Sequence, residues 1–221
     1  MGVKMQLKAV IFDLDGTIAD TIKLTLYSIR EYIRIKTGKQ YTDEDILAEF
    51  GPIDTYIIRK FIPDNTGENF ISDYVKLVSD CFDKMVKPIE GISEMLSFIK
   101  EKGIKTALFT GRSRITAELV LEKLGIKQYF DNIMAGDDTS KFKPNPEGII
   151  KSLAVLGVNP EECAYVGDFD VDIHASRNAG TMAILALWSA TANKELIKLN
   201  PDAAFETPYE LINWIQDNTK L

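Results

Sequence analysis

Short, continuous apolar runs recur along the chain, and segments with helical periodicity separate each run from the next. The first run covers Ala9–Phe12, and later runs cover 106–110, 133–135, 163–166 and 182–187. A strand has a continuous apolar sequence when both of its faces are buried, as in a parallel sheet covered by helices. The alternation therefore predicts an α/β fold built on a doubly wound parallel sheet.

The segments between these runs carry start and stop signals of helices. Ser113 stands where one helix begins and Gly125 where it ends, in agreement with capping preferences. A second helix opens at Asn145-Pro146 and stops at Gly157, and a third covers about 92–102. Helices that lead directly into the next strand are the connections that a parallel sheet requires.

Residues 20–86 differ from the rest because they contain long helical patterns and no convincing strand. Chain breakers at Gly38, Gly51-Pro52 and Pro63 divide this segment into about four helices. We expect residues 1–19 and 87–221 to form the α/β core and residues 20–86 to form a helical insertion.

Composition excludes several classes of function. The 221 residues carry a formal net charge of -7, which argues against a nucleic-acid partner because phosphate backbones select basic surfaces. The two cysteines, Cys81 and Cys163, lack the spacing of a thiolate metal site or of a disulfide framework. The early apolar stretch is too short for a signal peptide or a membrane span, so we expect a cytoplasmic protein without a membrane partner. We expect a monomer or a homodimer.

Two carboxylates, Asp13 and Asp15, stand where the first buried strand meets a Gly-Thr turn. An ionised pair at the end of a buried strand needs charge compensation, and a cation would supply it. The pattern Asp-x-Asp-Gly-Thr is therefore more informative than an ordinary turn, although turns also favour Asp and Gly.

The sequence FDLDGT, at Phe12–Thr17, resembles the first motif of the haloacid dehalogenase superfamily of aspartate-nucleophile phosphohydrolases. The other motifs follow in the expected order: Thr110 in FTGRS, Lys143 in KFKPNP, and Asp168 and Asp172 in VGDFDVD. The resemblance spans nearly the whole chain. It implies a Rossmann-like core with an inserted helical cap of type one, similar to phosphoglycolate phosphatases.

The motif residues suit phosphoryl transfer, which depends on positioning and charge neutralisation. Asp13 can attack phosphorus to give an aspartyl-phosphate, and Asp15 can act as general acid and base. Thr110 and Gly111 at a helix N-terminus can bind phosphate. Lys143 can neutralise phosphate; Lys141 is the competitor, but Lys143 directly precedes a proline as in the family signature.

Oxygen ligands indicate Mg²⁺ as the cofactor. Asp13 and Asp168 are the candidate carboxylate ligands. The resemblance implies that Asp15 ligates the ion through its backbone carbonyl. It also implies that Asp172 either ligates through water or orients the other ligands.

We therefore expect a Mg²⁺-dependent phosphatase of a small phosphorylated metabolite, similar to phosphoglycolate phosphatases. A pyrophosphatase is an alternative, as is a sugar-phosphate mutase, although such mutases tend to have Val where this chain has Thr17. A non-catalytic scaffold is a further alternative, but no nucleophile or metal ligand is lost. Substrate specificity is expected at the turn containing Gly51 and at Arg112, which could reach a substrate anion.

Overall fold

The computed structural model describes residues 6–62 and 69–218, and its sheet has six parallel strands in the order β3-β2-β1-β4-β5-β6. The strands are β1 Ala9–Phe12, β2 Lys105–Phe109, β3 Asn132–Met134, β4 Cys163–Gly167, β5 Met182–Ala186 and β6 Ala203–Phe205. This confirms the predicted fold class. Strand order reverses between β1 and β4, and α/β sheets of this topology bind ligands at the carboxyl ends of the two strands that flank such a reversal.

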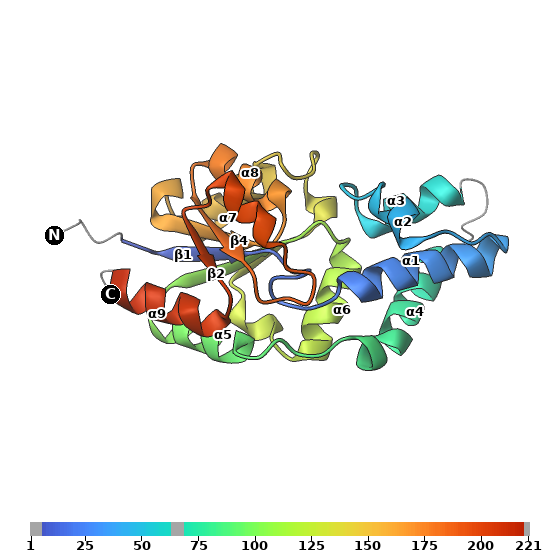
Figure 1. Ribbon diagram of the computed structural model, residues 1–221, viewed down its shortest axis with the longest axis horizontal. Helices are drawn as coiled ribbons and strands as arrows, with labels where there is room; N and C mark the ends of the chain where they lie inside the picture. Colours follow the sequence, from blue (N-terminus) through green and yellow to red (C-terminus); the bar gives the residue numbers. More distant parts are fainter. Residues whose placement is uncertain (1–5, 63–68, 219–221) are drawn as a thin grey trace.

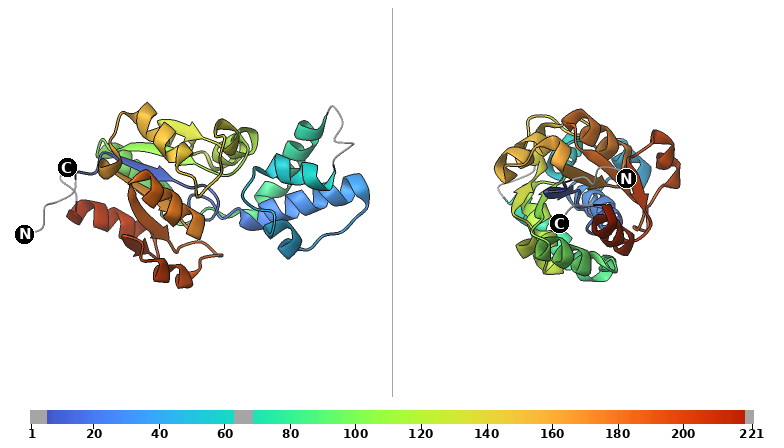
Figure 2. Two further views of the ribbon diagram at one scale, coloured as in Figure 1. Left: turned by 90° about the horizontal axis from the view of Figure 1, so that it is seen from above. Right: turned by 90° about the vertical axis from the view of Figure 1, so that its left-hand side faces the viewer.

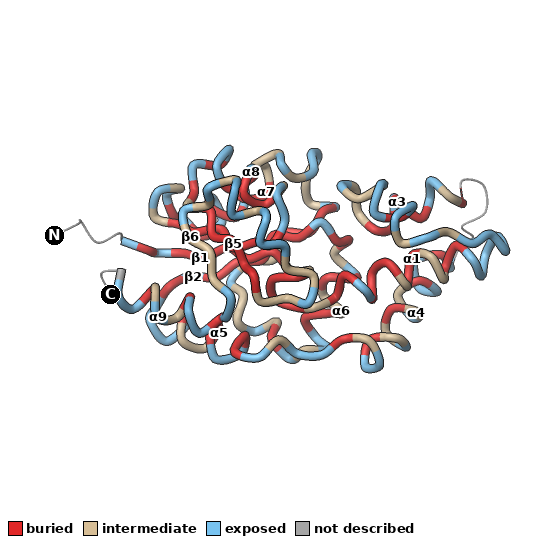
Figure 3. Tube along the Cα trace, viewed as in Figure 1, coloured by how far each residue is buried: buried red, intermediate tan, exposed pale blue. Residues whose placement is uncertain are grey.

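Helices cover both faces of the sheet (Figure 1). One face packs against α5 Ile92–Glu101, α6 Arg114–Leu124 and α9 Pro208–Asn218, and the other against α7 Glu147–Leu156 and α8 Asp170–Ala179. Successive residues of β1 divide between these layers, because Val10 and Phe12 belong to one core cluster and Ala9 and Ile11 to the other. The fully buried strand explains its continuous apolar sequence (Figure 3).

Four helices lie together beyond the carboxyl ends of the strands (Figure 2). They are α1 Ile22–Thr37, α2 Asp43–Leu47, α3 Asp54–Phe61 and α4 Phe70–Met85. Tyr32 of α1 packs edge-on against Phe70 and Tyr74 of α4, with ring centroids 5.6 and 5.7 Å apart. The breaker expected at Pro63 lies outside the described residues.

The last strand, β6, was not expected from the sequence. Its residues Ala203–Phe205 are all half-buried, and the strand lies at an edge of the sheet with β5 as its neighbour. An edge strand of three residues has too little buried surface to require a long apolar run. The other strands lie within about a residue of their predicted ranges.

No helix within residues 6–62 and 69–218 has the length and apolar composition needed to cross a membrane. Cys81 and Cys163 are both free thiols, and Cys163 is buried in β4. Burial raises the pKa of the Cys163 thiol to about 12.

Replacing Phe12, which is fully buried in β1, tests the role of this strand in stability. Phe12→Ala should lower the free energy of unfolding by about 3 to 5 kcal/mol, because it leaves a cavity in the larger core cluster. Urea denaturation followed by circular dichroism measures the change. The control Ile150→Ala removes an exposed side chain of α7 and should cost less than about 0.5 kcal/mol.

Candidate active site

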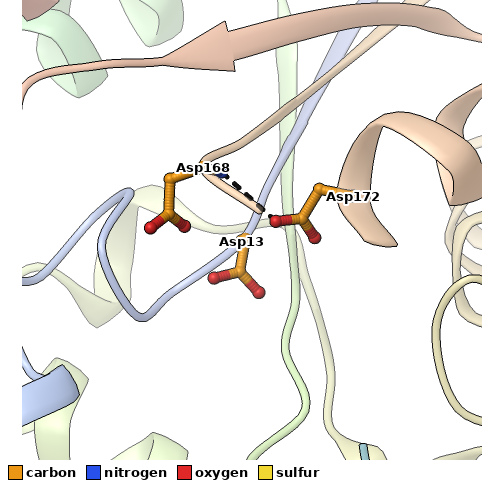
Figure 4. Close-up of side chains that lie close together, drawn as sticks. All are labelled: Asp13, Asp168 and Asp172. Atoms are coloured by element: carbon orange, nitrogen blue, oxygen red, sulfur yellow. Dashed lines mark hydrogen bonds between the residues drawn. The ribbon is translucent and has the colours of Figure 1, made fainter. Parts of the chain in front are cut away.

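Three buried carboxylates meet at the reversal of strand order. Asp13 directly follows β1, Asp168 directly follows β4, and Asp172 lies in the first turn of α8 (Figure 4). Each offers an oxygen atom, and these atoms lie within 4.8 Å of one another. Since β1 and β4 are paired in parallel, with Phe12 opposite Val166, their ends place Asp13 and Asp168 side by side.

The turn after β1 approaches Asp168 so closely that only glycine fits at position 16. Gly16 has φ +82°, and a Cβ atom built there would lie 2.0 Å from Asp168 Oδ2. The hydroxyl of Thr17 donates to Asp168 Oδ1 at 3.2 Å. The indole Nε1 of Trp188, which follows β5 closely, donates to the Thr17 carbonyl at 2.7 Å. The Gly-Thr turn therefore fixes the Asp168 side chain.

Asp172 accepts hydrogen bonds from four groups. Its Oδ1 accepts from Lys143 Nζ at 2.8 Å and from the Tyr165 hydroxyl at 3.1 Å. Its Oδ2 accepts from the backbone N–H groups of Asp168 at 3.2 Å and Phe169 at 3.0 Å. Each carboxylate oxygen of Asp172 thus already accepts two hydrogen bonds, which favours a role in orienting the neighbouring side chains.

Lys143 lies between two of the carboxylates. Its Nζ donates to Asp13 Oδ1 at 2.5 Å as well as to Asp172, and it lies 4.9 Å from the ring centroid of Phe109. Burial alone would lower the pKa of Lys143, but the Asp13 and Asp172 carboxylates raise it above its ordinary value. Lys141, the competitor, is exposed, so the fold brings Lys143 to Asp13.

The cluster has an excess of negative charge. Burial, followed by the neighbouring carboxylates Asp172 and Asp15, raises the pKa of Asp13, although Lys143 opposes the shift. Burial and then Asp13 and Asp172 raise the pKa of Asp168. One ammonium group therefore does not neutralise the site. Crowded carboxylate oxygens are the donor set that a divalent cation fits.

The loop after β2 borders the same cavity. Thr110 is fully buried, and its hydroxyl accepts a hydrogen bond from the backbone N–H of Arg112 at 3.1 Å. Gly111 is exposed, and a Cβ atom added there would meet open space. Thr110, Gly111, Asp13 and Lys143 all line one cavity, so the structure brings these predicted residues together.

Arg112 binds Asp15 in this structure, a pairing that the sequence did not reveal. Its Nε lies 2.8 and 2.9 Å from the two Asp15 oxygens, and its Nη2 lies 2.6 Å from Oδ1. Thr21, just before α1, donates to the same Oδ1 at 2.5 Å, and Nη2 also donates to Thr25. Burial alone would lower the pKa of Arg112, but Asp15 raises it above its ordinary value. The Arg112 side chain is 3% exposed, so its guanidinium is directed to Asp15 and the helical insertion.

Asp54, at the start of α3, is a second residue that the sequence analysis missed. Its side chain is buried and accepts from the backbone N–H of Ser113 at 3.2 Å and from the Thr116 hydroxyl at 2.7 Å. Ser113 is the N-cap residue of α6 and Gly125 its C-cap residue, as predicted, but the Ser113 side chain makes no capping hydrogen bond. Two carboxylates instead accept hydrogen bonds from backbone N–H groups at the N-terminus of α6. Asp54 accepts from Ser113, and Asp137 accepts from Arg114 at 2.7 Å.

The turn at Gly51-Pro52 also reaches the site. Both residues line the cavity of about 340 Å³ that contains Asp13 and Lys143. Gly51 has φ +138°, so any other residue would be strained there whatever the available space. The neighbouring Ile53 side chain packs so closely on Gly136 that a Cβ atom there would lie 2.3 Å from Ile53 Cγ2. Residues 51–54 therefore contact the core beside the carboxylate cluster.

Comparison of the whole chain with known proteins finds a matching family. The model of the haloacid dehalogenase-like hydrolase family matches residues 10–186. A curated relative, the pyrophosphatase PpaX of Bacillus cereus strain AH820, is 31% identical over 96% of this chain and 98% of its own length.

Solved structures share the fold over nearly the whole length. A β-phosphoglucomutase from Clostridium difficile has a TM-score of 0.77 and 24% identity, and covers 96% of each chain. A predicted phosphoglycolate phosphatase from Haemophilus somnus 129PT has a TM-score of 0.75 and 19% identity, over 95% of this chain and 98% of its own. At these identities the similarity establishes the fold alone.

Asp54 offers a test of the contact between the helical insertion and the loop after β2. Asp54→Ala should lower kcat/KM by about tenfold, because it leaves the buried Ser113 N–H unsatisfied and loosens the loop next to Thr110. Steady-state kinetics and a thermal denaturation curve measure the two effects separately. Asp73→Ala, which removes an exposed carboxylate of α4, is the control and should change neither. An unchanged kcat/KM in Asp54→Ala would contradict this role.

Proposed function

Because this chain belongs to the haloacid dehalogenase-like hydrolases, we propose that it is a Mg²⁺-dependent phosphatase acting through an aspartyl-phosphate at Asp13. It is an enzyme of the phosphoric monoester hydrolase type. The observation that carries the mechanism is the position of Asp13, whose carboxylate contacts Lys143 at 2.5 Å on a cavity also lined by Thr110 and Gly111. The substrate is a small phosphorylated metabolite.

Catalysis proceeds in two displacements at phosphorus. An oxygen of Asp13 attacks, the bond from phosphorus to the leaving oxygen breaks, and Asp15 donates a proton to that oxygen. Asp15 then takes a proton from water, which attacks the aspartyl-phosphate and releases inorganic phosphate with Asp13 regenerated. Arg112 and Thr21 position the Asp15 carboxylate through the contacts described above.

The phosphoryl oxygens bind to groups that oppose their charge. The Thr110 hydroxyl and the Gly111 N–H stand at the loop that leads into α6, where the helix N-terminus favours anions. The Lys143 ammonium neutralises charge on Asp13 and on the phosphoryl group as they approach.

The buried carboxylates fit a hard divalent ion. Asp13, Asp168 and the Asp15 carbonyl would hold it, with Asp172 as an outer ligand or an orienting group. Bound Mg²⁺ would neutralise the negative charge that builds up where an anionic nucleophile meets an anionic phosphate.

Residues 20–86 would act as a cap that excludes water from this chemistry. They supply Ile22, Ile29, Phe50 and Ile57 to the cavity wall, opposite the carboxylate cluster of the core. A partly apolar cavity of about 340 Å³ favours a small substrate.

A pyrophosphatase is the second candidate, and the observation that favours it is the similarity to the pyrophosphatase PpaX proteins. The two functions share the same nucleophile and differ in the leaving group, which is a phosphate for pyrophosphate and an alcohol for a monoester. Purified protein with Mg²⁺, tested on pyrophosphate and on a panel of phosphate monoesters, separates them.

Asp13→Asn removes the nucleophile with almost no change in side-chain volume. Turnover should fall by on the order of a thousandfold or more, because the covalent route is lost. The wild-type protein, quenched in acid during turnover of a ³²P-labelled ester, should carry hydroxylamine-labile phosphate on the peptide containing Asp13. Asp83→Asn, an exposed carboxylate of α4, is the matched control and should retain activity. Near-normal turnover in Asp13→Asn would refute the mechanism.

Removal of divalent ions should abolish activity, and added Mg²⁺ should restore it, since the carboxylates of the cluster repel one another without a cation. Mg²⁺ should also raise the melting temperature of the wild-type protein, and Asp168→Asn should lose most of that increase. Differential scanning fluorimetry measures this binding independently of activity. Full activity in excess chelator would exclude a metal requirement.

A further inference from the structure

The catalytic cavity extends well beyond the carboxylate cluster. Its volume of about 340 Å³ accommodates a small organic molecule, of which a phosphoryl group fills only part. The wall that the helical insertion contributes contains the apolar side chains of Ile22, Ile29 and Ile57. The remaining space is therefore suited to a leaving group with an apolar body.

Two phenyl groups of the core are exposed where they line this cavity. Phe142 precedes Lys143 and is 39% exposed, and Phe169 follows Asp168 and is 38% exposed. Phe142 is adjacent in sequence to Lys143 and Phe169 to Asp168, so both rings line the cavity close to the carboxylate cluster. Phe50, from the turn before Gly51-Pro52, lines the same cavity and is half-buried. A ligand that covers exposed aromatic surface removes it from water, which makes the free energy of binding more favourable.

Within the described cavity lining, Lys143 and Arg112 each form an ion pair with a carboxylate. Lys143 binds Asp13 and Asp172. Arg112 binds Asp15 through Nε and Nη2, its Nη1 is buried without a hydrogen-bond partner among the described residues, and the side chain is 3% exposed. The remaining charged residues of the lining are carboxylates, namely Asp54 and Asp170. A second anionic group on the substrate would therefore meet negative charge, at a cost in binding free energy.

From the apolar wall, the exposed phenyls and the paired cations, we propose that the preferred substrate is a phosphate monoester of a neutral alcohol with a planar apolar body. Phe142 and Phe169 contact that body from the core, and Phe50 contacts it from the helical insertion. This inference rests on the proposed phosphatase function and names its substrate class. It sets the enzyme apart from hydrolases of pyrophosphate or of carboxylated phosphate esters.

Benzyl phosphate and ethyl phosphate form the central comparison, because both release a primary alcohol of similar acidity and differ in the planar ring. With Mg²⁺ present, kcat/KM for benzyl phosphate should exceed that for ethyl phosphate by about tenfold or more. It should also exceed the values for 2-phosphoglycolate and inorganic pyrophosphate, whose leaving groups are anionic.

Variants of Phe142 and Phe169 test whether these rings cause the preference for benzyl phosphate. Phe142→Ala and Phe169→Ala should each reduce the benzyl-to-ethyl ratio of kcat/KM by about fivefold to tenfold, mainly through KM for benzyl phosphate. Phe142→Tyr keeps the ring and should keep the ratio. The control Ile150→Ala removes an exposed side chain of α7 outside the cavity lining and should leave the ratio unchanged. Thermal denaturation verifies that each variant is folded.

Several results would overturn the inference while leaving the phosphatase function intact. These are equal kcat/KM for benzyl and ethyl phosphate, a higher kcat/KM for pyrophosphate or 2-phosphoglycolate than for benzyl phosphate, or an unchanged ratio in both alanine variants. Hydrolysis of none of the four compounds in the presence of Mg²⁺ would instead overturn the proposed function, and this inference with it.

Discussion

The buried ammonium of Lys143 is the interaction on which the arrangement of the site depends. It donates to Asp13, which follows β1, and to Asp172 in α8. It therefore connects the two segments that carry two of the three clustered carboxylates. A buried charge pair is expensive to desolvate, and removal of one member leaves the other uncompensated. Lys143 therefore makes the close approach of these carboxylates tolerable. It does not complete the neutralisation, and the remaining negative charge is what fits the site to a divalent cation.

Much of the fold was predictable because the relevant signals are local. The buried strands appear as short apolar runs, and the motif residues follow strand ends, where parallel topology collects them. The ion pair between Arg112 and Asp15 joins residues 97 positions apart, and Asp54 contacts Ser113 across 59 positions. The first pair depends on the parallel pairing of β1 with β2, and the second depends on how the helical insertion packs on the core. No local pattern encodes either arrangement. Strand β6 was missed because an edge strand with half-buried residues lacks the apolar signature.

Family membership and substrate preference rest on different parts of the molecule. In the proposed mechanism, Asp13, Lys143 and the carboxylate cluster act on phosphate and would serve any leaving group. The residues that border the rest of the cavity come from α1, from α3 and the turn before it, and from core loops that include Phe142 and Phe169. A relative that shares the first set can therefore act on a different compound, which is why similarity to a pyrophosphatase does not decide the substrate of this chain.

One of the two tryptophans, Trp188, contacts the turn that follows β1. Its indole donates to the carbonyl of Thr17, whose hydroxyl in turn holds Asp168. The second tryptophan, Trp214, packs against Phe205 of β6 at a ring-centroid separation of 6.1 Å, on a different element. Indole emission responds to nearby charge and polarity, so the contact through Thr17 couples the emission of Trp188 to the charge at Asp168. The native chain thus contains an optical reporter of the carboxylate cluster that needs no label.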